Sequence, residues 1–312
     1  MKNIILFLLF ILLLQSCAQD YITVQEQNIK NIIAEDYPRI DGSTSSLPIL
    51  QEIYKSIHAY ELINGQATWS ELPQEASKTI DSYKMLISGE LDLIIVPYPS
   101  EEIQSLIVEK NIELDYIPIC LEALIFIVNK EANVKNITTE ELKKIYIDAS
   151  VDNWSQIGGI NNKIGALVRN QDSGSHSLME KFILQGEEMN EEINEYNTII
   201  TMFAMVEEVE NYINNNNVDS YKNPLPLGYT VYYYFKNNKK TQNWDNIEIL
   251  NINGVEPNNQ TIASKEYPYS TCYYAVIKKD TPIDATPRKL ISWLLSKESQ
   301  ELFKRAGFGT IK

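Results

Sequence analysis

The pattern of apolar and polar positions along the chain predicts an α/β fold. Residues 91–96 (Leu-Asp-Leu-Ile-Ile-Val) form a mostly apolar run stopped by Pro97, which is typical of a buried strand. Strand and helical patterns alternate from Tyr37 towards the C-terminus, which indicates an α/β architecture. One helix face is predicted from five apolar residues at helical spacing: Ile49, Leu50, Ile53, Tyr54 and Ile57.

The same reasoning predicts most of the remaining elements. Thr138 and Glu141 form a capping-box pattern ahead of a helix. The other expected elements are a helix from Ser100 through Val108, strands at 124–128, 164–168 and 273–277, a turn at 153–159, a loop-to-helix transition at 173–184 with Leu178, Phe182 and Ile183 on one face, and an amphipathic helix at 290–303.

The N-terminal segment has the features of a secretory signal. A short basic start is followed by an apolar run from Ile4 to Leu14, shorter than the roughly 20 residues that span a bilayer. The run ends in Leu14-Gln15-Ser16-Cys17, which resembles the lipobox of bacterial lipoproteins. That resemblance implies cleavage before Cys17, fatty-acid (palmitate) attachment to Cys17, and anchoring to a cell membrane or an outer membrane. The alternative is an ordinary signal peptide with an incidental cysteine.

Residues 1–16 are therefore expected to be a signal peptide, and residues 17–37 a lipidated N-terminus and spacer with a short helix. The remaining length suits two domains. Lys and Arg total 27 against 42 Asp and Glu, a net charge of −15, which argues against a nucleic-acid surface. Three Cys and two His are too few for a closed zinc site, so neither a metal nor another cofactor is expected.

Two polar Ser/Thr loops each follow a strand pattern and precede a helix pattern, at 41–46 and at 169–176. A helix N-terminus carries unpaired N–H groups and a partial positive charge, so it attracts anions. Arg169 adds a planar fork suited to tetrahedral oxyanions. A third polar stretch at 77–83 offers Thr79 and Ser82 as donors. Each loop alone is also explained as a helix cap, and Arg169 as a surface ion pair with Asp172.

Together these segments resemble the phosphate-binding proteins that feed ABC importers, the PstS-like family. The resemblance rests on five stretches: Gly42-Ser43-Thr44-Ser45-Ser46-Leu47-Pro48, Arg169 with Ser173-Gly174-Ser175, Gly89 to Leu93 with Pro99 to Glu102, the stretch from Asn129 through Asn153-Trp154 to Gly159, and Gly228-Tyr229 before Tyr232 to Tyr234. It extends from about Tyr37 to the C-terminus.

The resemblance implies a two-lobed, type II periplasmic-binding-protein fold in which two crossing strands join the lobes and the ligand lies between them. The first lobe would combine 38–118 with 272–312, and the second would be 119–271. It implies a monomeric, non-enzymatic lipoprotein that captures inorganic phosphate, or a related oxyanion, for a membrane permease. The ligand contacts would fall on Ser43, Thr44, Ser45, Ser46, Leu47 (through its backbone N–H), Thr79, Arg169, Ser173, Gly174 and Ser175.

One position departs from the family pattern. Many members place an Asp after the strand equivalent to 91–96, where it accepts the proton of hydrogen phosphate, and here Pro97 takes that place. An acceptor at this point rejects fully ionised oxyanions. Asp41, Asp81 and Asp172 are the candidates to replace it.

Two other functions fit parts of the sequence. A serine hydrolase would use Ser173 or Ser175 with His176 as base, but no Gly-x-Ser-x-Gly elbow is present. A sensory or scavenging lipoprotein without a transporter would have the same sequence features as an importer component. Cys120 and Cys272 both fall where the lobes should join; two buried thiols are favoured there over a disulfide.

Overall fold

The computed structural model describes residues 29–58, 72–196, 198–213 and 223–311. The predicted signal peptide, Cys17 and most of the spacer lie outside these ranges. In chain order, the described elements are β1 (Ile40–Gly42), η1 (Thr44–Ser46), α2 (Leu47–Ile57), α4 (Thr79–Ser88), β2 (Leu93–Val96), α5 (Glu101–Glu109), β3 (Leu114–Asn129), η3 (Lys130–Ala132), β4 (Asn136–Ile137), α6 (Thr139–Tyr146), η4 (Trp154–Ile157), β5 (Ile164–Ala166), β6 (Val168–Arg169), α7 (Gly174–Met179), η5 (Glu180–Leu184), α8 (Glu191–Tyr196), β7 (Thr198–Ile199), α9 (Met202–Glu210), β8 (Leu225–Val231), α10 (Tyr232–Gln242), β9 (Ile247–Ile249), β10 (Asn251–Ile252), α11 (Asn259–Ala263), β11 (Ser270–Lys278), α12 (Thr286–Leu294) and α13 (Lys297–Arg305).

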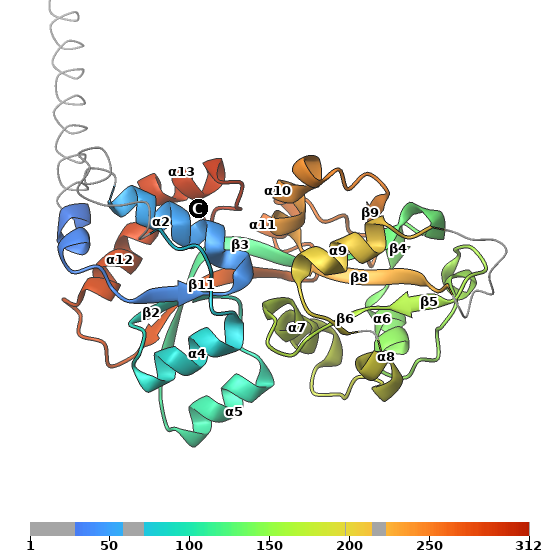
Figure 1. The fold of residues 1–312 in the computed structure, drawn as a ribbon, viewed down its shortest axis with the longest axis horizontal. Coiled ribbons are helices and arrows are strands. Elements are labelled where there is room, and N and C mark those ends of the chain that lie inside the picture. The colour runs from blue at the N-terminus through green and yellow to red at the C-terminus, as the bar shows by residue number, and fades with distance from the viewer. Residues whose placement is uncertain (1–28, 59–71, 197, 214–222, 312) are drawn as a thin grey trace, which may run out of the picture.

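A long mixed sheet runs through the molecule. Among the described residues seven strands form it, in the order β1-β2-β11-β3-β8-β5 with β9 also paired to β3. β3 is 16 residues long; its first part pairs antiparallel with β11, and its last part pairs with β8 and β9. Figure 1 shows two lobes joined by β3 and β11: the first carries β1, β2, α2, α4, α5, α12 and α13, and the second carries β4 to β10 and α6 to α11. The expected α/β fold class is confirmed.

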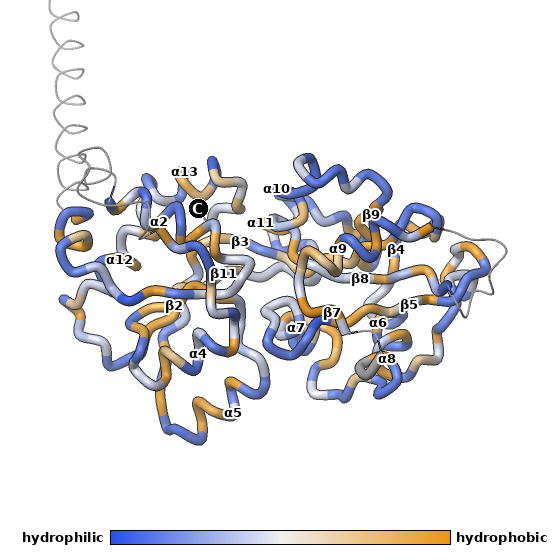
Figure 2. Tube along the Cα trace, viewed as in Figure 1, coloured by the Kyte–Doolittle hydropathy of each residue, from blue (hydrophilic) through white to orange (hydrophobic). Residues whose placement is uncertain are grey.

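The sheet of the first lobe is covered on both faces. Alternate residues of a strand point to opposite faces, and in β2 Leu93 and Ile95 join the main core beside α2, whereas Ile94 and Val96 pack with α4 and α5. The tube in Figure 2 follows this arrangement, with apolar strands inside and mixed helices outside. The predicted apolar face of α2 is confirmed, because all five of its residues are buried. The capping box of Thr138 and Glu141 is present at the start of α6.

Two predicted elements are each divided in the structure. The expected single helix at 290–303 is α12 followed by α13, because the Ser296 side chain accepts a hydrogen bond from Ser299 N and starts a new helix. The expected strand at 164–168 becomes β5 and β6: β5 pairs with β8, and β6 leaves the sheet to pair with β7. This departure carries Arg169 towards the space between the lobes.

The loop-to-helix transition at 173–184 is confirmed, although the helix changes its winding. α7 continues into a π-helical turn at Glu180–Leu184. Leu178 and Ile183, five residues apart, are both fully buried, and the wider i to i+5 period brings such residues to the same side. The stretch at 153–159, expected as a turn, contains the short helix η4 with its own capping box.

The packed body begins earlier than the expected boundary at residue 38. Residues 29–35 are helical, and Ile33 is fully buried in the main core. Lys30 forms an ion pair with Glu298 at 2.8 Å, and the Thr286 hydroxyl donates to Asp36 at 2.6 Å. The end of the predicted spacer is therefore attached to α12 and α13.

The two cysteines at the junction of the lobes are free thiols, Cys120 buried and Cys272 partly buried. In the antiparallel register Cys272 lies opposite Leu121 and Cys120 opposite Tyr273. None of the helices within the described ranges is long and apolar enough to cross a bilayer.

Candidate functional site

A small cavity lies where the two lobes meet. Its volume is about 110 Å³, whereas pockets for drug-sized ligands usually measure about 300–1,000 Å³. At roughly 30 Å³ per water molecule, the space suits a small ion. Segments that are far apart in sequence line it, and their residues are Ser43, Thr44, Ser45, Lys78, Thr79, Arg169, Asn170, Asp172, Ser173, Gly174, Ile200, Thr201 and Met202.

The first lining segment is the turn between β1 and α2. A side chain at Gly42 would collide with the carbonyl of Ile95, so only glycine allows β1 to run this close to β2. The Ser43 and Ser45 hydroxyls lie 3.1 Å apart and both are buried. Ser46, in contrast, donates its hydroxyl proton to the carbonyls of Ile95 (2.6 Å) and Ser43 (2.9 Å) and braces the turn from behind.

The second lining segment is the start of α4. Lys78 precedes the helix with φ of 76°, a conformation that is uncommon for a non-glycine residue and that recurs at functional sites. α4 begins without a side-chain cap. The Thr79 hydroxyl is buried, and it has no hydrogen-bond partner among the described residues. A buried hydroxyl without a partner carries a desolvation cost that a bound acceptor would remove.

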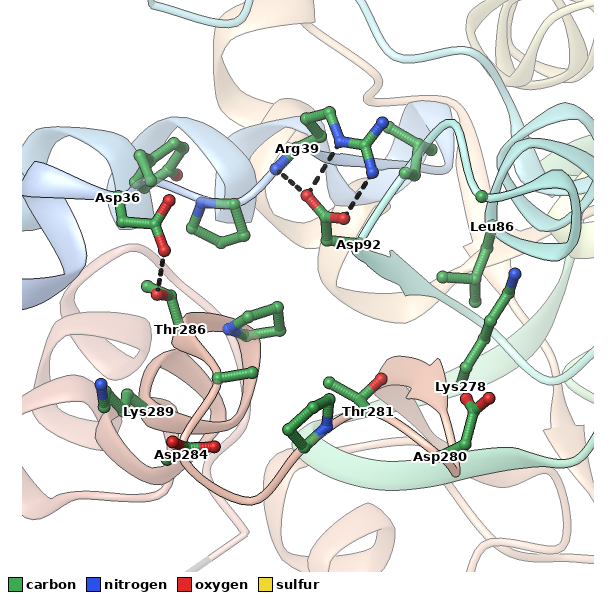
Figure 3. Close-up of a pocket in the computed structure, with 17 residues that line it drawn as sticks. Asp36, Arg39, Leu86, Asp92, Lys278, Asp280, Thr281, Asp284, Thr286 and Lys289 are labelled. Carbon is green, nitrogen blue, oxygen red and sulfur yellow. Dashed lines mark hydrogen bonds and ion pairs between the residues drawn. The ribbon is translucent and has the colours of Figure 1, made fainter.

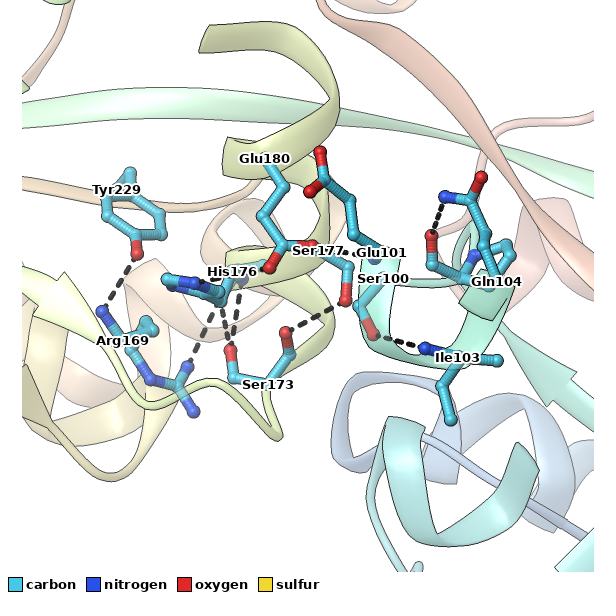
Figure 4. A network of polar contacts seen from close by, with 12 residues as sticks. Ser100, Glu101, Ile103, Gln104, Arg169, Ser173, His176, Ser177, Glu180 and Tyr229 are labelled. Atoms are coloured by element: carbon cyan, nitrogen blue, oxygen red, sulfur yellow. Dashed lines mark hydrogen bonds and ion pairs between the residues drawn. The ribbon is translucent and has the colours of Figure 1, made fainter. Parts of the chain in front are cut away.

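The third lining segment carries the one arginine among the described residues of the cavity wall. Arg169 is 7% exposed, and its guanidinium donates to the carbonyls of Ile199 (3.1 Å) and Ile200 (3.0 Å) and to the Ser175 hydroxyl (3.4 Å). Its backbone N–H donates to the Tyr229 hydroxyl, as Figure 4 shows. Within the described residues no carboxylate pairs with Arg169, and burial lowers its pKa to about 10. The site therefore contains a buried cation that no carboxylate of the described residues neutralises.

α7 provides a further helix N-terminus at the same place. Ser173 caps this helix by accepting from His176 N, and its hydroxyl lies 2.9 Å from that of Ser175. Helices α4 and α7 start from opposite lobes, and both starts line the cavity. Because N-terminal N–H groups favour negative charge, the arrangement is suited to a small anion.

Contacts also cross the seam between the lobes around the cavity. Lys78 lies 3.9 Å from Asp172 at the rim, and both side chains are about half exposed. The Glu101 N–H at the start of α5 donates to Glu180 at 3.3 Å, and the Lys181 ammonium lies 4.2 Å from the centre of the Tyr98 ring. The lobes are therefore in contact at the cavity rim and also where η5 meets the segment at the start of α5.

The structure brings most of the predicted ligand residues together. Seven of them line the cavity: Ser43, Thr44, Ser45, Thr79, Arg169, Ser173 and Gly174. Ser175, Ser46 and Leu47 are not among the lining residues. The Ser175 hydroxyl accepts a hydrogen bond from the lining residue Arg169 and so supports the wall from behind. The Ser82 hydroxyl donates to the carbonyls of Gly42 and Lys78 and so joins the first two segments.

Sequence reasoning did not identify the lining residues Lys78, Asn170 and the stretch 200–202. The Thr201 side chain caps α9, and this Thr before an apolar helix pattern was the available signal. Of the three Asp candidates, Asp172 lines the cavity, whereas Asp41 accepts from the backbone N–H groups of Gly42 and Ser77. Asp81 is exposed in the first turn of α4.

The arrangement of Ser173, Ser175 and His176 does not form a nucleophile–base pair. In the part of the chain that the structure describes, no hydrogen bond joins the His176 imidazole to either hydroxyl. The ring lies 3.6 Å from Glu180, and burial lowers the pKa of His176 to about 4. A general base needs hydrogen-bond reach to its nucleophile.

A larger cavity of about 740 Å³ lies in the first lobe, away from the predicted residues (Figure 3). Several of its charged groups already have partners: Arg39 is bonded to Asp92 through two side-chain contacts, and Asp36 accepts from Thr286. The smaller cavity between the lobes combines the buried cation with the hydroxyls, and it is the stronger candidate for ligand binding.

Gly174 permits the close approach of the lobes at this cavity. A Cβ at this position would lie 2.6 Å from Pro97 Cγ and 2.8 Å from Thr79 Oγ1, both in the opposite lobe. Gly174→Ala is therefore expected to hold the lobes apart and to weaken anion binding about 5- to 150-fold, the equivalent of 1–3 kcal/mol of overpacking. Titration calorimetry measures the affinity, and small-angle scattering measures the opening. Unchanged affinity would contradict this role of the glycine.

Two α/β lobes that enclose a small, donor-lined cavity define the class of bilobal solute-binding proteins. A family model described as a PBP superfamily domain matches residues 33–298, and the chain belongs to this superfamily. The phosphate-binding protein PstS of Borreliella burgdorferi is 28% identical over 291 residues, which cover 91% of this chain and 94% of that protein.

Solved structures show the same fold. The crystal structure of PstS from Borrelia burgdorferi matches with a TM-score of 0.53 at 24% identity, covering 88% of this chain and 98% of that one. A Clostridium perfringens protein, assigned as a phosphate ABC transporter substrate-binding protein and solved with bound phosphate, matches with a TM-score of 0.63 at 19% identity and the same coverage.

Proposed function

We propose that the chain is an extracytoplasmic solute-binding protein that captures inorganic phosphate, or a similar tetrahedral oxyanion, for an ABC importer. The observation that carries the proposal is the buried Arg169 guanidinium, which lies on the wall of a small cavity and has no carboxylate partner in the described residues. The partnerless Thr79 hydroxyl and the helix starts from both lobes supply further donors. The names of the relatives support phosphate as the ligand.

Binding would proceed by closure of the lobes over the anion, without chemical conversion. Donors from both lobes contact the ligand only when the lobes are together, so the ligand favours the closed state. The proposed contact residues are those predicted from the sequence: Ser43, Thr44, Ser45, Ser46, Leu47, Thr79, Arg169, Ser173, Gly174 and Ser175. The proposed lobes are 38–118 with 272–312 and 119–271, joined by β3 and β11.

The proposal includes a lipid anchor. The lipobox-like end of the signal segment supports fatty-acid attachment at Cys17, which would hold a monomeric protein at the outer side of a membrane, next to its permease. Metabolic labelling with a fatty-acid analogue tests this point. A wild-type chain should be labelled, and Cys17→Ala should not be.

Isothermal titration with phosphate tests the ligand, and Thr79→Val tests the site. The substitution keeps the shape and removes a hydroxyl that we place on the anion. We expect phosphate affinity to fall about 10- to 100-fold, as for the loss of one hydrogen bond to a charged group. Thr241→Val, an exposed change on α10, is the matched control. Equal affinities of Thr79→Val and wild type would remove Thr79 from the site.

A further inference from the structure

A site that selects a protonated anion needs a buried hydrogen-bond acceptor, and the charged groups around this cavity do not provide one among the described residues. Among the described lining residues Asp172 is the one carboxylate, and it is half exposed at the rim beside Lys78. Pro97 lies against Gly174 at the seam and offers no acceptor side chain. The buried polar side chains on the wall are hydroxyls and a guanidinium, which can all donate hydrogen bonds to an anion of either protonation state.

Asn170 provides the one carboxamide among the described residues of the wall. It follows Arg169 at the end of β6, where its N–H donates to Ile199 O at 3.4 Å and its carbonyl accepts from Ser173 N at 3.0 Å. These backbone bonds fix its position between Arg169 and the start of α7. Its side-chain oxygen, Oδ1, is buried, and no described residue donates to it. A buried acceptor without a partner requires an explanation.

A carboxamide differs from a carboxylate in one property that matters here. A carboxylate only accepts, so it repels an oxyanion that brings no proton. An amide presents an acceptor oxygen in one orientation and an NH₂ donor after a 180° flip. It can therefore accept from the P–OH group of hydrogen phosphate or donate to the bare oxygen of sulfate, with little difference in free energy.

We propose that Asn170 contacts the ligand oxygen that carries a proton in hydrogen phosphate and none in sulfate. Its amide then makes the site accept tetrahedral dianions whether or not they carry a proton. This inference rests on the proposed function. It adds sulfate to phosphate as a ligand of the site. It also makes one side chain responsible for the range of oxyanions that the site binds.

The test compares phosphate and sulfate by titration calorimetry at about pH 8, in a chloride buffer free of other oxyanions. At this pH both ligands are mainly dianions, so the charge is matched. Wild-type protein is expected to bind the two within about tenfold of each other. Asn170→Asp, of the same shape, should raise the preference for phosphate at least 100-fold, mainly through loss of sulfate binding, because an acceptor-only group then faces an unprotonated oxygen.

Two further variants separate a ligand contact from a structural role. Asn170→Leu should weaken both anions by a similar factor, about tenfold, and leave their ratio near the wild-type value, since it removes donor and acceptor together. Asn243→Asp, at an exposed amide after α10, is the matched control and should leave both affinities unchanged.

The outcomes are distinct. A wild-type preference for phosphate above about 1,000-fold would overturn the inference, and so would an Asn170→Asp variant with the wild-type ratio. In either case the proposed function would stand. A wild-type chain that binds neither phosphate nor sulfate would overturn the proposed function and this inference together.

Discussion

Arg169→Ala is expected to lose about 2–5 kcal/mol of phosphate-binding free energy, roughly a 30- to 5,000-fold drop in affinity. The reason is the position of the guanidinium: it is 7% exposed, on the cavity wall, and bonded to carbonyls and a hydroxyl rather than to a carboxylate. A bound anion would be its neutralising partner. Titration calorimetry with phosphate measures the loss directly.

Two comparisons make this result specific. Arg169→Lys keeps the charge but not the planar fork, so we expect an intermediate loss. Arg39→Ala removes a more exposed arginine that is bonded to Asp92 in the first lobe, and it should leave phosphate affinity unchanged. The free energy of unfolding should change little in Arg169→Ala, because relief of the desolvation cost of a buried cation offsets the loss of its hydrogen bonds to Ile199, Ile200 and Ser175. Wild-type affinity in Arg169→Ala would exclude the proposed site.

Local patterns explain which elements could be predicted from sequence. The apolar face of α2 and the capping box of α6 depend on residues within a few positions of one another, and both are confirmed. The donor-rich starts of α2, α4 and α7 could also be predicted, because Ser, Thr and Gly before an apolar helix pattern indicate a helix N-terminus. That these starts meet at one cavity followed only from the family resemblance.

The parts that were missed depend on contacts distant in sequence. Lys78 reaches the cavity through a backbone conformation with positive φ, which its sequence context does not indicate. Asn170 and the 200–202 stretch come together because β6 pairs with β7 across 30 residues of chain, as in the pairing of Arg169 with Ile199. β3 was recognised only at 124–128, because Pro118 and Glu122 interrupt the apolar pattern of its first part.

Glu122 is the clearest case of a residue whose environment could not be read from the sequence. It lies in β3 at the junction of the lobes and is 2% exposed. Its Oε1 accepts from Ala123 N at 2.9 Å and from Tyr233 N, at the start of α10, at 3.0 Å, and the Tyr273 hydroxyl lies close enough to the carboxyl to counter part of the effect of burial on its pKa. Burial raises the pKa of Glu122 to about 8.

The raised pKa makes folding weaken as the pH rises. Below pH 4.5, the ordinary pKa of a glutamate, the carboxyl is protonated in both the folded and the unfolded chain and contributes no difference. Between this value and about 8, the unfolded chain gives up the proton while the folded chain keeps it, so rising pH favours unfolding. Above pH 8 the loss is complete and amounts to about 3–5 kcal/mol.

Glu122→Gln should remove this dependence, because the amide stays neutral and its oxygen can still accept from Ala123 and Tyr233. In urea unfolding, we expect the variant to be more stable than wild type by about 3–5 kcal/mol at pH 9 and within about 1 kcal/mol of it at pH 5. Glu210→Gln is the control: this buried carboxylate accepts from Asn246 with both oxygens, and its replacement should give no gain at pH 9. The contradicting result would be a stability difference between Glu122→Gln and wild type that is the same at pH 5 and pH 9. It would mean that Glu122 is ionised in the folded protein at both pH values. Groups at the junction of the lobes other than the two N–H donors would then stabilise its charge.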